Sequence, residues 1–196
     1  MTICVAVKVQ DCTVFAADSA SSLQGVDATG RPVVIKVFQH GNKVFNVYKG
    51  LPICAMTCGM GNIGDSSIAT LAKDLRVELS DSQGKYYLDP KNYTIEDVSN
   101  RAFDFFYSEK YMGLPVKPVG EHSFEFWIGG YGSSGNSSQV WRVQIVNGNC
   151  AGPTEVLPSD QIGIQASGQP DAINRIVLGY SVNLQDALLS AGVLPG

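Results

Sequence analysis

Strand-forming residues dominate the first 59 residues of the chain, before any helical pattern begins. Short polar breaks separate most of these stretches, among them Gln10–Cys12 and His40–Asn42. Strands joined by such short turns pair in the antiparallel sense, because a parallel pair needs a long crossover. The chain therefore begins as an antiparallel sheet. The predicted strands are 3–9, 13–18, 33–38, 43–48 and 53–57, and residues 19–32 are predicted to form a loop.

The first predicted strand also indicates a buried face. Its β-branched residues alternate with small or polar ones, which places them on one side of the strand. We expect burial mainly through Ile3, Val5, Val7 and Val9.

Helical periodicity starts after Gly64, where apolar residues recur at a spacing that gives one buried face. A second helix is expected to begin at Thr94, with Asp97 completing a capping box. Strands then return at 123–131, 138–146 and 161–166, and helices follow at 170–180 and, capped by Asn183, at 184–192. The residues expected to be buried are Ile68, Leu71, Ala72, Leu75 and Leu79 in the first helix, and Val98, Ala102, Phe105 and Phe106 in the second.

The order of elements is therefore sheet, two helices, sheet, helices. This order predicts an α+β fold, a four-layer αββα sandwich of two antiparallel sheets flanked by helices. A length of 196 residues suits one domain, and we expect a single domain over residues 1–196.

Composition excludes several classes of function. With 44% apolar and 16% charged residues and a net charge of −4, the chain has no basic surface suited to nucleic acid or anionic membranes. It has no apolar run of membrane-spanning length and no signal-peptide pattern, so the cytoplasm is the expected compartment. The five cysteines fit neither a disulfide framework nor a zinc site, and most are expected to be small core residues. We expect no metal.

The stretch from Cys58 to Asp65, CGMGNIGD, matches the Gly-x-Gly-x-x-Gly pattern of dinucleotide-binding loops. That pattern belongs between parallel strands, normally at the first strand. Here several hairpin-linked strands precede it. Three interpretations stay open: a nucleotide loop, which needs a parallel strand after the following helix; glycines that only allow close packing; or backbone amides that hold a developing oxyanion.

The start of the chain, MTICVAVKVQDCTVFAADS, resembles the opening of proteasome β-type subunits, which belong to the N-terminal nucleophile hydrolases. The stretch NKVF, followed by a strand and GMGNIGD, resembles their lysine strand, oxyanion turn and first helix. The Met-Thr start and the Gly-Asn pair are similar to Anbu-type bacterial proteasome homologues in particular. Weaker similarity reaches QASGQPDAINRIVLGY, so the resemblance covers nearly the whole chain.

The chemistry of such a start is clear on its own terms. Once Met1 is removed, the hydroxyl of Thr2 lies next to its own α-amino group, whose ordinary pKa of about 7.7 to 8.0 suits a general base. By resemblance, Asp18 holds Lys43, whose charge lowers the pKa of the Thr2 hydroxyl and amine. Lys36 is a competitor for that lysine because the loop after Asp18 is long.

The resemblance assigns four further residues. The Gly61 amide is expected to be the oxyanion donor, Gly59 to line the pocket for the substrate side chain, and Ser22 to bind substrate backbone. Ser167 is expected to support the N-terminal amine, or simply to begin a helix. In the family, an aspartate and a second serine of the amine's hydrogen-bond shell follow the last helices, and this sequence ends at LPG before a match to them.

Together these features predict a threonine-type peptidase without a cofactor. By resemblance, it assembles with itself into a ring or related multimer, cleaves peptides or unfolded proteins, and works with an unfoldase. Two other functions remain open: a catalytically silent scaffold of the same fold, and an amidase acting on small molecules.

Overall fold

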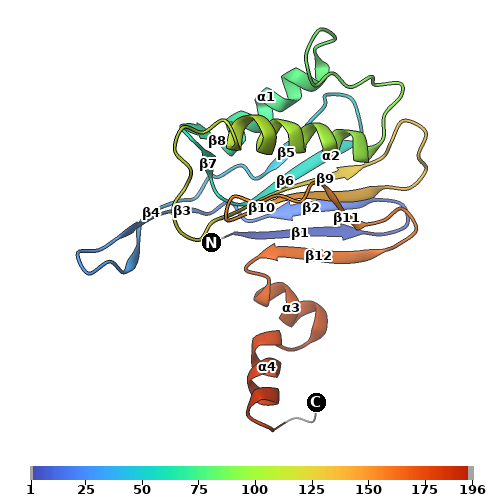
Figure 1. Ribbon diagram of the computed structural model, residues 1–196. Coiled ribbons are helices and arrows are strands. Elements are labelled where there is room, and N and C mark those ends of the chain that lie inside the picture. Colours follow the sequence, from blue (N-terminus) through green and yellow to red (C-terminus); the bar gives the residue numbers. More distant parts are fainter. Residues whose placement is uncertain (1, 194–196) are drawn as a thin grey trace.

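The structure is a computed structural model that describes residues 2–193. Two antiparallel sheets lie face to face, and helices cover the outer face of the larger sheet (Figure 1). One apolar cluster lies between the helices and the larger sheet, and a second lies between the two sheets. The predicted combination of helices with antiparallel sheets is therefore confirmed.

The smaller sheet has the strand order β12-β1-β2. Both pairs are antiparallel, and the first strand of the chain is the central one. Its elements are β1 (Ile3–Lys8), β2 (Thr13–Ala17) and β12 (Gly163–Gly168).

The larger sheet has the order β11-β10-β9-β6-β5, again antiparallel throughout. Its elements are β5 (Val44–Asn46), β6 (Ile53–Gly59), β9 (Ser123–Gly130), β10 (Gln139–Val146) and β11 (Thr154–Leu157). No strand was predicted at β11. It is a short edge strand, and its four residues carry little periodic signal.

Two hairpins complete the strands. One, β3 (Ser21–Val26) with β4 (Pro32–Phe38), projects from the body beside the start of β1 (Figure 1). The prediction of a loop over residues 19–32 was therefore wrong in part, because pairing with the apolar β4 makes the polar β3 segment extended. The other hairpin joins β7 (Asn62–Ile63) to β8 (Ser66–Ser67).

The helices above the larger sheet bury the faces that the periodicity predicts, and the Thr94–Asp97 capping box is present. The C-terminal helix is capped by Ser181 rather than by Asn183. No helix within residues 2–193 is long and apolar enough to cross a membrane. The helices are α1 (Ile68–Ser80), α2 (Ile95–Phe103), its π-helical continuation η1 (Asp104–Tyr111), α3 (Asp171–Leu178) and α4 (Val182–Ser190).

The central strand β1 faces the opposite way from the prediction. Its buried residues are Cys4, Ala6 and Lys8, whereas Ile3, Val5 and Val7 are only half-buried and Val9 is exposed. Small residues are selected on the inner face because β1 packs directly against β6 of the other sheet. The β-branched residues consequently form part of the outer face of the smaller sheet.

The fourth layer of the predicted sandwich is not confirmed. Helices α3 and α4 follow β12 and extend away from the body, and neither contributes a buried residue (Figure 1). A four-layer arrangement therefore stays a prediction.

The context of the glycine stretch does not suit a nucleotide loop. The first strand after α1 and α2 is β9, and it pairs with β6 in the antiparallel sense. In the sheets of residues 2–193 every strand pair is antiparallel. The parallel strand that a dinucleotide-binding unit requires does not follow this helix.

A buried ammonium group lies at the C-terminal end of β1. Lys8 is only 2% exposed, and its Nζ donates to the carbonyl oxygens of Pro158 at 2.7 Å, Ser159 at 3.1 Å and Gln161. Three convergent carbonyl dipoles compensate for the desolvation of the charge. This contact ties β1 to the turn that precedes β12.

We expect Lys8→Met to lower the free energy of unfolding by about 1 to 3 kcal/mol, because buried carbonyl oxygens lose their donor. Urea unfolding followed by circular dichroism measures the change. Lys73→Met, at an exposed position on α1, is the matched control and should stay within about 0.5 kcal/mol of the wild type. Equal effects of both substitutions would contradict a structural role for the Lys8 ammonium.

Candidate active site

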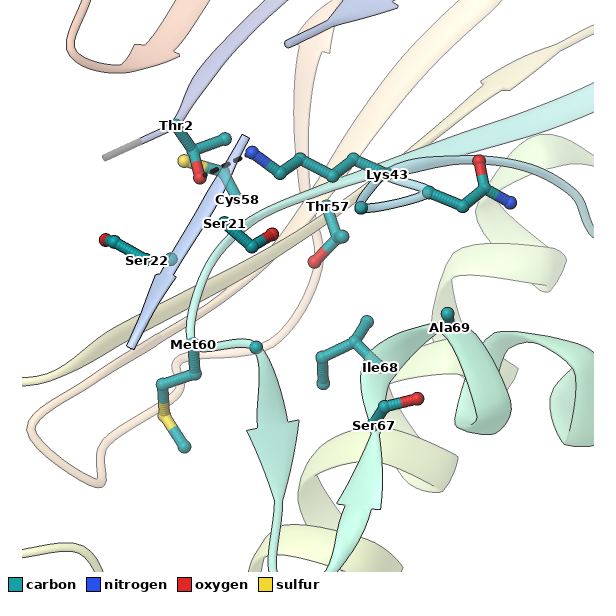
Figure 2. A pocket seen from close by; sticks show the side chains of 14 residues that line it. Thr2, Ser21, Ser22, Lys43, Thr57, Cys58, Met60, Ser67, Ile68 and Ala69 are labelled. Atoms are coloured by element: carbon teal, nitrogen blue, oxygen red, sulfur yellow. Dashed lines mark hydrogen bonds between the residues drawn. The ribbon is translucent and has the colours of Figure 1, made fainter. Parts of the chain in front are cut away.

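A cavity of about 420 Å³ opens where the start of β1, the base of the β3–β4 hairpin and the end of β6 meet. Figure 2 shows Thr2 and Lys43 at one side of it and the first residues of α1 at the other. Its lining residues are Thr2, Ser21, Ser22, Gly41, Asn42, Lys43, Thr57, Cys58, Gly59, Met60, Gly61, Ser67, Ile68 and Ala69.

The ammonium of Lys43 contacts three other residues at the cavity wall. Its Nζ lies 2.8 Å from Oδ1 of Asp18 and 3.1 Å from Oγ1 of Thr2, and it also donates to the carbonyl oxygen of Ala20. Lys43 is 8% exposed, so its charge is shielded from water and depends on these acceptors. A positive charge directed at a hydroxyl oxygen favours the deprotonated, nucleophilic form of that hydroxyl.

Asp18 is held as a carboxylate. Partial burial acts to raise its pKa, but the hydrogen bonds from Lys43 and from the amides of Ile3 and Ala20, together with the charge of Lys43, outweigh burial and hold the pKa below its usual value. The amide of Asp18 donates in turn to the carbonyl oxygen of Ile3. Asp18 therefore aligns Lys43 with the first residues of β1.

The backbone of Thr2 is positioned by the end of β12. Its carbonyl oxygen accepts a hydrogen bond from the amide of Gln169 at 2.9 Å. Gly168 has a φ of +85°, and a Cβ atom there would lie 2.0 Å from the Thr2 carbonyl oxygen. Glycine is required because the two chain segments approach so closely.

The two candidate lysines lie in different places. Lys43 precedes β5, and its carbonyl oxygen accepts from the amide of Thr57, which fixes it against β6. Lys36 lies on the projecting strand β4, with its Nζ over the ring of Phe38, 5.0 Å from the centroid. The structure brings Lys43, and not Lys36, to Thr2 and Asp18.

The glycine turn after β6 has distinct parts. Gly59 has a φ of +92°, and a Cβ there would lie 2.1 Å from the carbonyl oxygen of Ser123, so only glycine fits. The amide of Met60 donates to that same oxygen at 2.8 Å. Gly61 lines the cavity, and its carbonyl oxygen accepts from the amide of Ile68. Among the backbone hydrogen bonds of turns and loops in residues 2–193, none uses the Gly61 amide as donor.

The two serines predicted for the site lie in different places. Ser22 lines the cavity from β3. Ser167 pairs with Cys4 in the smaller sheet and hydrogen-bonds Cys58, so it lies behind the cavity wall rather than in it.

Sequence reasoning missed several residues of the cavity wall, above all Cys58, which Figure 2 places beside Thr2. Most of the cysteines were expected to be small core residues, and Cys58 is indeed buried in the cluster between the sheets, but it also lines the cavity. The available signal was the position of Cys58 directly before Gly59, the residue predicted to line the pocket for the substrate side chain. Within residues 2–193, no three His, Cys, Asp or Glu side chains gather in a way that could hold a metal ion.

No protein-family model and no curated protein matches the chain. Solved structures do match it. The helical assembly of the Anbu complex from Pseudomonas aeruginosa aligns with 97% of this chain and 72% of its own, at 17% identity and a TM-score of 0.50. Anbu, an ancestral β-subunit, from Yersinia bercovieri aligns with 96% of this chain and 71% of its own, at 13% identity and a TM-score of 0.49.

The chain has a fold like that of the Anbu subunit. This finding confirms the resemblance to Anbu-type, proteasome-like subunits that the sequence predicts. At 17% identity the similarity concerns the fold and does not extend to a reaction.

The depressed pKa of Asp18 predicts how stability depends on pH. Because its pKa is lower in the folded than in the unfolded chain, its contribution is complete above the unfolded value of about 3.9 and is lost as the pH falls through the folded value. We expect Asp18→Asn to lower the free energy of unfolding by about 1 to 2 kcal/mol at pH 6, and the difference from wild type to shrink below about pH 4. Urea unfolding between pH 6 and 3 measures this difference. Asp160→Asn, in an exposed turn, is the control, and a difference for Asp18→Asn that does not vary with pH would contradict the ion pair.

Proposed function

We propose that this protein is a threonine-type N-terminal nucleophile hydrolase that cleaves peptide bonds. One observation carries the proposal: the hydroxyl of Thr2 faces a cavity and accepts a hydrogen bond from a buried lysine that is itself paired with Asp18. A hydroxyl at the second residue of a chain has little reason to meet a buried ammonium unless its nucleophilicity is used.

The proposed reaction begins after removal of Met1. Oγ1 of Thr2 attacks the carbonyl carbon of the substrate, and its proton passes to the free α-amine of the same residue. The ammonium of Lys43 favours the alkoxide character of the oxygen. The negative charge that forms on the carbonyl oxygen is stabilised by a backbone amide of the glycine turn, for which we propose Gly61.

Collapse of this tetrahedral intermediate expels the substrate amine, which takes the proton from the α-ammonium group. An ester between Thr2 and the acyl part of the substrate remains. Water then attacks the ester with the α-amine as base, which releases the acid and restores the threonine. No cofactor enters the reaction.

The remaining predicted site residues receive roles in the same scheme. Ser22, at the cavity rim, binds the backbone of the substrate, and Gly59 lines the pocket for the substrate side chain. Ser167 supports the N-terminal amine from behind the wall. The proposed substrates are peptides or unfolded proteins in the cytoplasm, delivered by an ATP-dependent unfoldase.

We further propose that the protein works as a homo-oligomer that restricts access to the cavity, a ring or a related multimer such as the helical assembly of the Pseudomonas Anbu complex. Exposed apolar side chains support this proposal. Val7 of the central strand β1 pairs with Val14 and Ile164, so all three point to the outer face of the smaller sheet, where the latter two are 53% and 44% exposed. An apolar sheet face of this kind is normally covered.

The C-terminal helices present a second apolar surface. Ile176 of α3 is 80% exposed and Leu184 of α4 is 57% exposed. We propose that both surfaces become buried when copies associate, and that α3 and α4 then complete the fourth layer of the sandwich.

The silent scaffold and the small-molecule amidase are the alternatives. Both keep the fold, and they differ in whether Thr2 reacts and with which amides. The following measurement separates them.

The reactivity of Thr2 tests the proposed reaction. Released from a cleavable fusion so that Thr2 is its first residue, the protein should form one covalent adduct with a peptide epoxyketone, detected by intact mass spectrometry. Thr2→Ala should form none. Lys43→Met should react at least about 100-fold more slowly, because the charge beside the hydroxyl is lost. The matched control, Lys36→Met on β4, should react like the wild type.

A free but unreactive Thr2 would overturn the peptidase proposal in favour of the scaffold. Adduct formation combined with hydrolysis of simple amides, but not of fluorogenic peptides, would identify the amidase instead.

The size of the protein in solution tests the proposed assembly. Light scattering coupled to size exclusion should find a multimer, and Ile164→Lys or Leu184→Lys should weaken it at least about tenfold, because a charge is introduced into an apolar interface. Val119→Lys is the control, since Val119 is 97% exposed in the segment between η1 and β9 and belongs to neither surface. A monomeric wild type at about 100 µM would contradict the proposed assembly.

A further inference from the structure

Two cysteine thiols touch one another behind the wall of the candidate active-site cavity. Cys4 lies on β1 and Cys58 on β6, so the contact joins the two sheets. The Cys4 thiol donates to the carbonyl oxygen of Thr57 at 3.0 Å and lies within hydrogen-bonding reach of the Cys58 thiol. Cysteines that meet across packed sheets are in a position that a disulfide can bridge when their backbones are close.

The approach of the backbones here is close. Strands β1 and β6 pack against one another, and Sγ of Cys4 lies 3.0 Å from the carbonyl oxygen of Thr57 on β6. A Cβ atom on Gly168, which follows the residue paired with Cys4, would lie 3.0 Å from Sγ of Cys58. The side chain of Cys58 therefore extends across the gap between the sheets and reaches the layer of β1 and β12.

The two thiols differ in access and in acidity. Cys58 lines the cavity, whereas Cys4 is fully buried. Contact with the Cys4 thiol, the hydrogen bond from Ser167 and the charge of Lys43 hold the pKa of Cys58 below its usual value against the opposing effects of burial and Glu125. The contact with Cys58 and burial raise the pKa of Cys4. Cys58 is thus the thiol that an oxidant in the cavity reaches, and Cys4 is the neighbouring thiol that can resolve the product.

We propose that Cys4 and Cys58 form an oxidative modification site that takes a peroxide. The thiolate of Cys58 attacks one oxygen of the peroxide, the O–O bond breaks, and hydroxide leaves, so that Cys58 becomes a sulfenic acid. The sulfur of Cys4 then attacks the Cys58 sulfur and loses its proton. Water leaves and the disulfide remains. A dithiol reduces this disulfide to the two thiols by exchange and becomes a disulfide itself.

The disulfide changes the wall next to Thr2. A bonded pair of sulfurs is about 2.05 Å apart, much closer than two thiols in contact, so β1 and β6 are drawn together two residues after Thr2. Cys58 also ceases to accept the hydrogen bond from Ser167. On the proposed function, on which this consequence rests, oxidation slows the reaction of Thr2.

The decisive experiment maps disulfides by mass spectrometry after treatment of the full chain with hydrogen peroxide and trypsin. We expect a cross-link between the first tryptic peptide, residues 1–8 or 2–8 after removal of Met1, and peptide 50–73, absent before treatment and lost again with dithiothreitol. Peptide 50–73 contains both Cys54 and Cys58, and this pair provides a matched control on one strand. Cys54 lies four residues before Cys58 on β6, about 13 Å along the strand, and outside the apolar cluster that contains Cys4 and Cys58, so it is too far from Cys4 to resolve the sulfenic acid.

The cross-link should persist in Cys54→Ser and disappear in Cys58→Ser. In Cys4→Ala the sulfenic acid has no resolving thiol, so dimedone should label Cys58. Absence of the cross-link in the wild type, or its persistence in Cys58→Ser, would overturn the proposal. These readouts do not require a reactive Thr2, so they decide the modification site even if the peptidase proposal fails.

The consequence for Thr2 is read separately. The rate of epoxyketone adduct formation in the wild type should fall at least about fivefold after oxidation and recover with dithiothreitol. A protein that cross-links with an unchanged adduct rate would show that the disulfide forms without affecting the nucleophile.

Discussion

The close packing of the smaller sheet on the larger one determines where everything else lies. It depends on small residues at the contact, Cys4 and Ala6 on β1 and Gly129 on β9, where a Cβ atom would lie 2.7 Å from the ring of Phe15. Because the sheets meet so closely, the first residues of β1 reach the end of β6 and the lysine that precedes β5. Larger side chains at this contact would separate the sheets and move Thr2 away from Lys43.

How well the sequence predicted each element depended on what covers it. The buried face of α1 was predicted residue by residue, because one helix face packs on one sheet and the periodicity records that directly. For strand β1 the predicted buried face was wrong, since its β-branched residues lie on the outer face while Cys4 and Ala6 lie inside. Hydrophobicity alone does not predict which of two apolar faces is buried, because that depends on the space between the strand and the opposing sheet.

The candidate site, too, was predicted from the sequence only in part. Thr2, Asp18 and Lys43 lie far apart in sequence, and only the resemblance to proteasome-like subunits suggested that they meet. The residues between Asp18 and Lys43 left Lys36 as an alternative until the β3–β4 hairpin was seen to carry it away from the body. Cys58 could not be assigned a neighbour from the sequence, because its contact with Cys4 depends on the distance between two sheets rather than on any local pattern.

One backbone contact has a wider consequence. The carbonyl oxygen of Thr2 is fixed by the amide of Gln169, next to a glycine that tolerates no side chain. The end of β12 therefore holds residue 2 in place through backbone contacts alone, and these contacts do not depend on the side chain of residue 2. A serine or a cysteine at that position would be presented to the same cavity at the same angle. The fold therefore fixes the position of the nucleophile, and the residue type at position 2 alone determines which nucleophile it is.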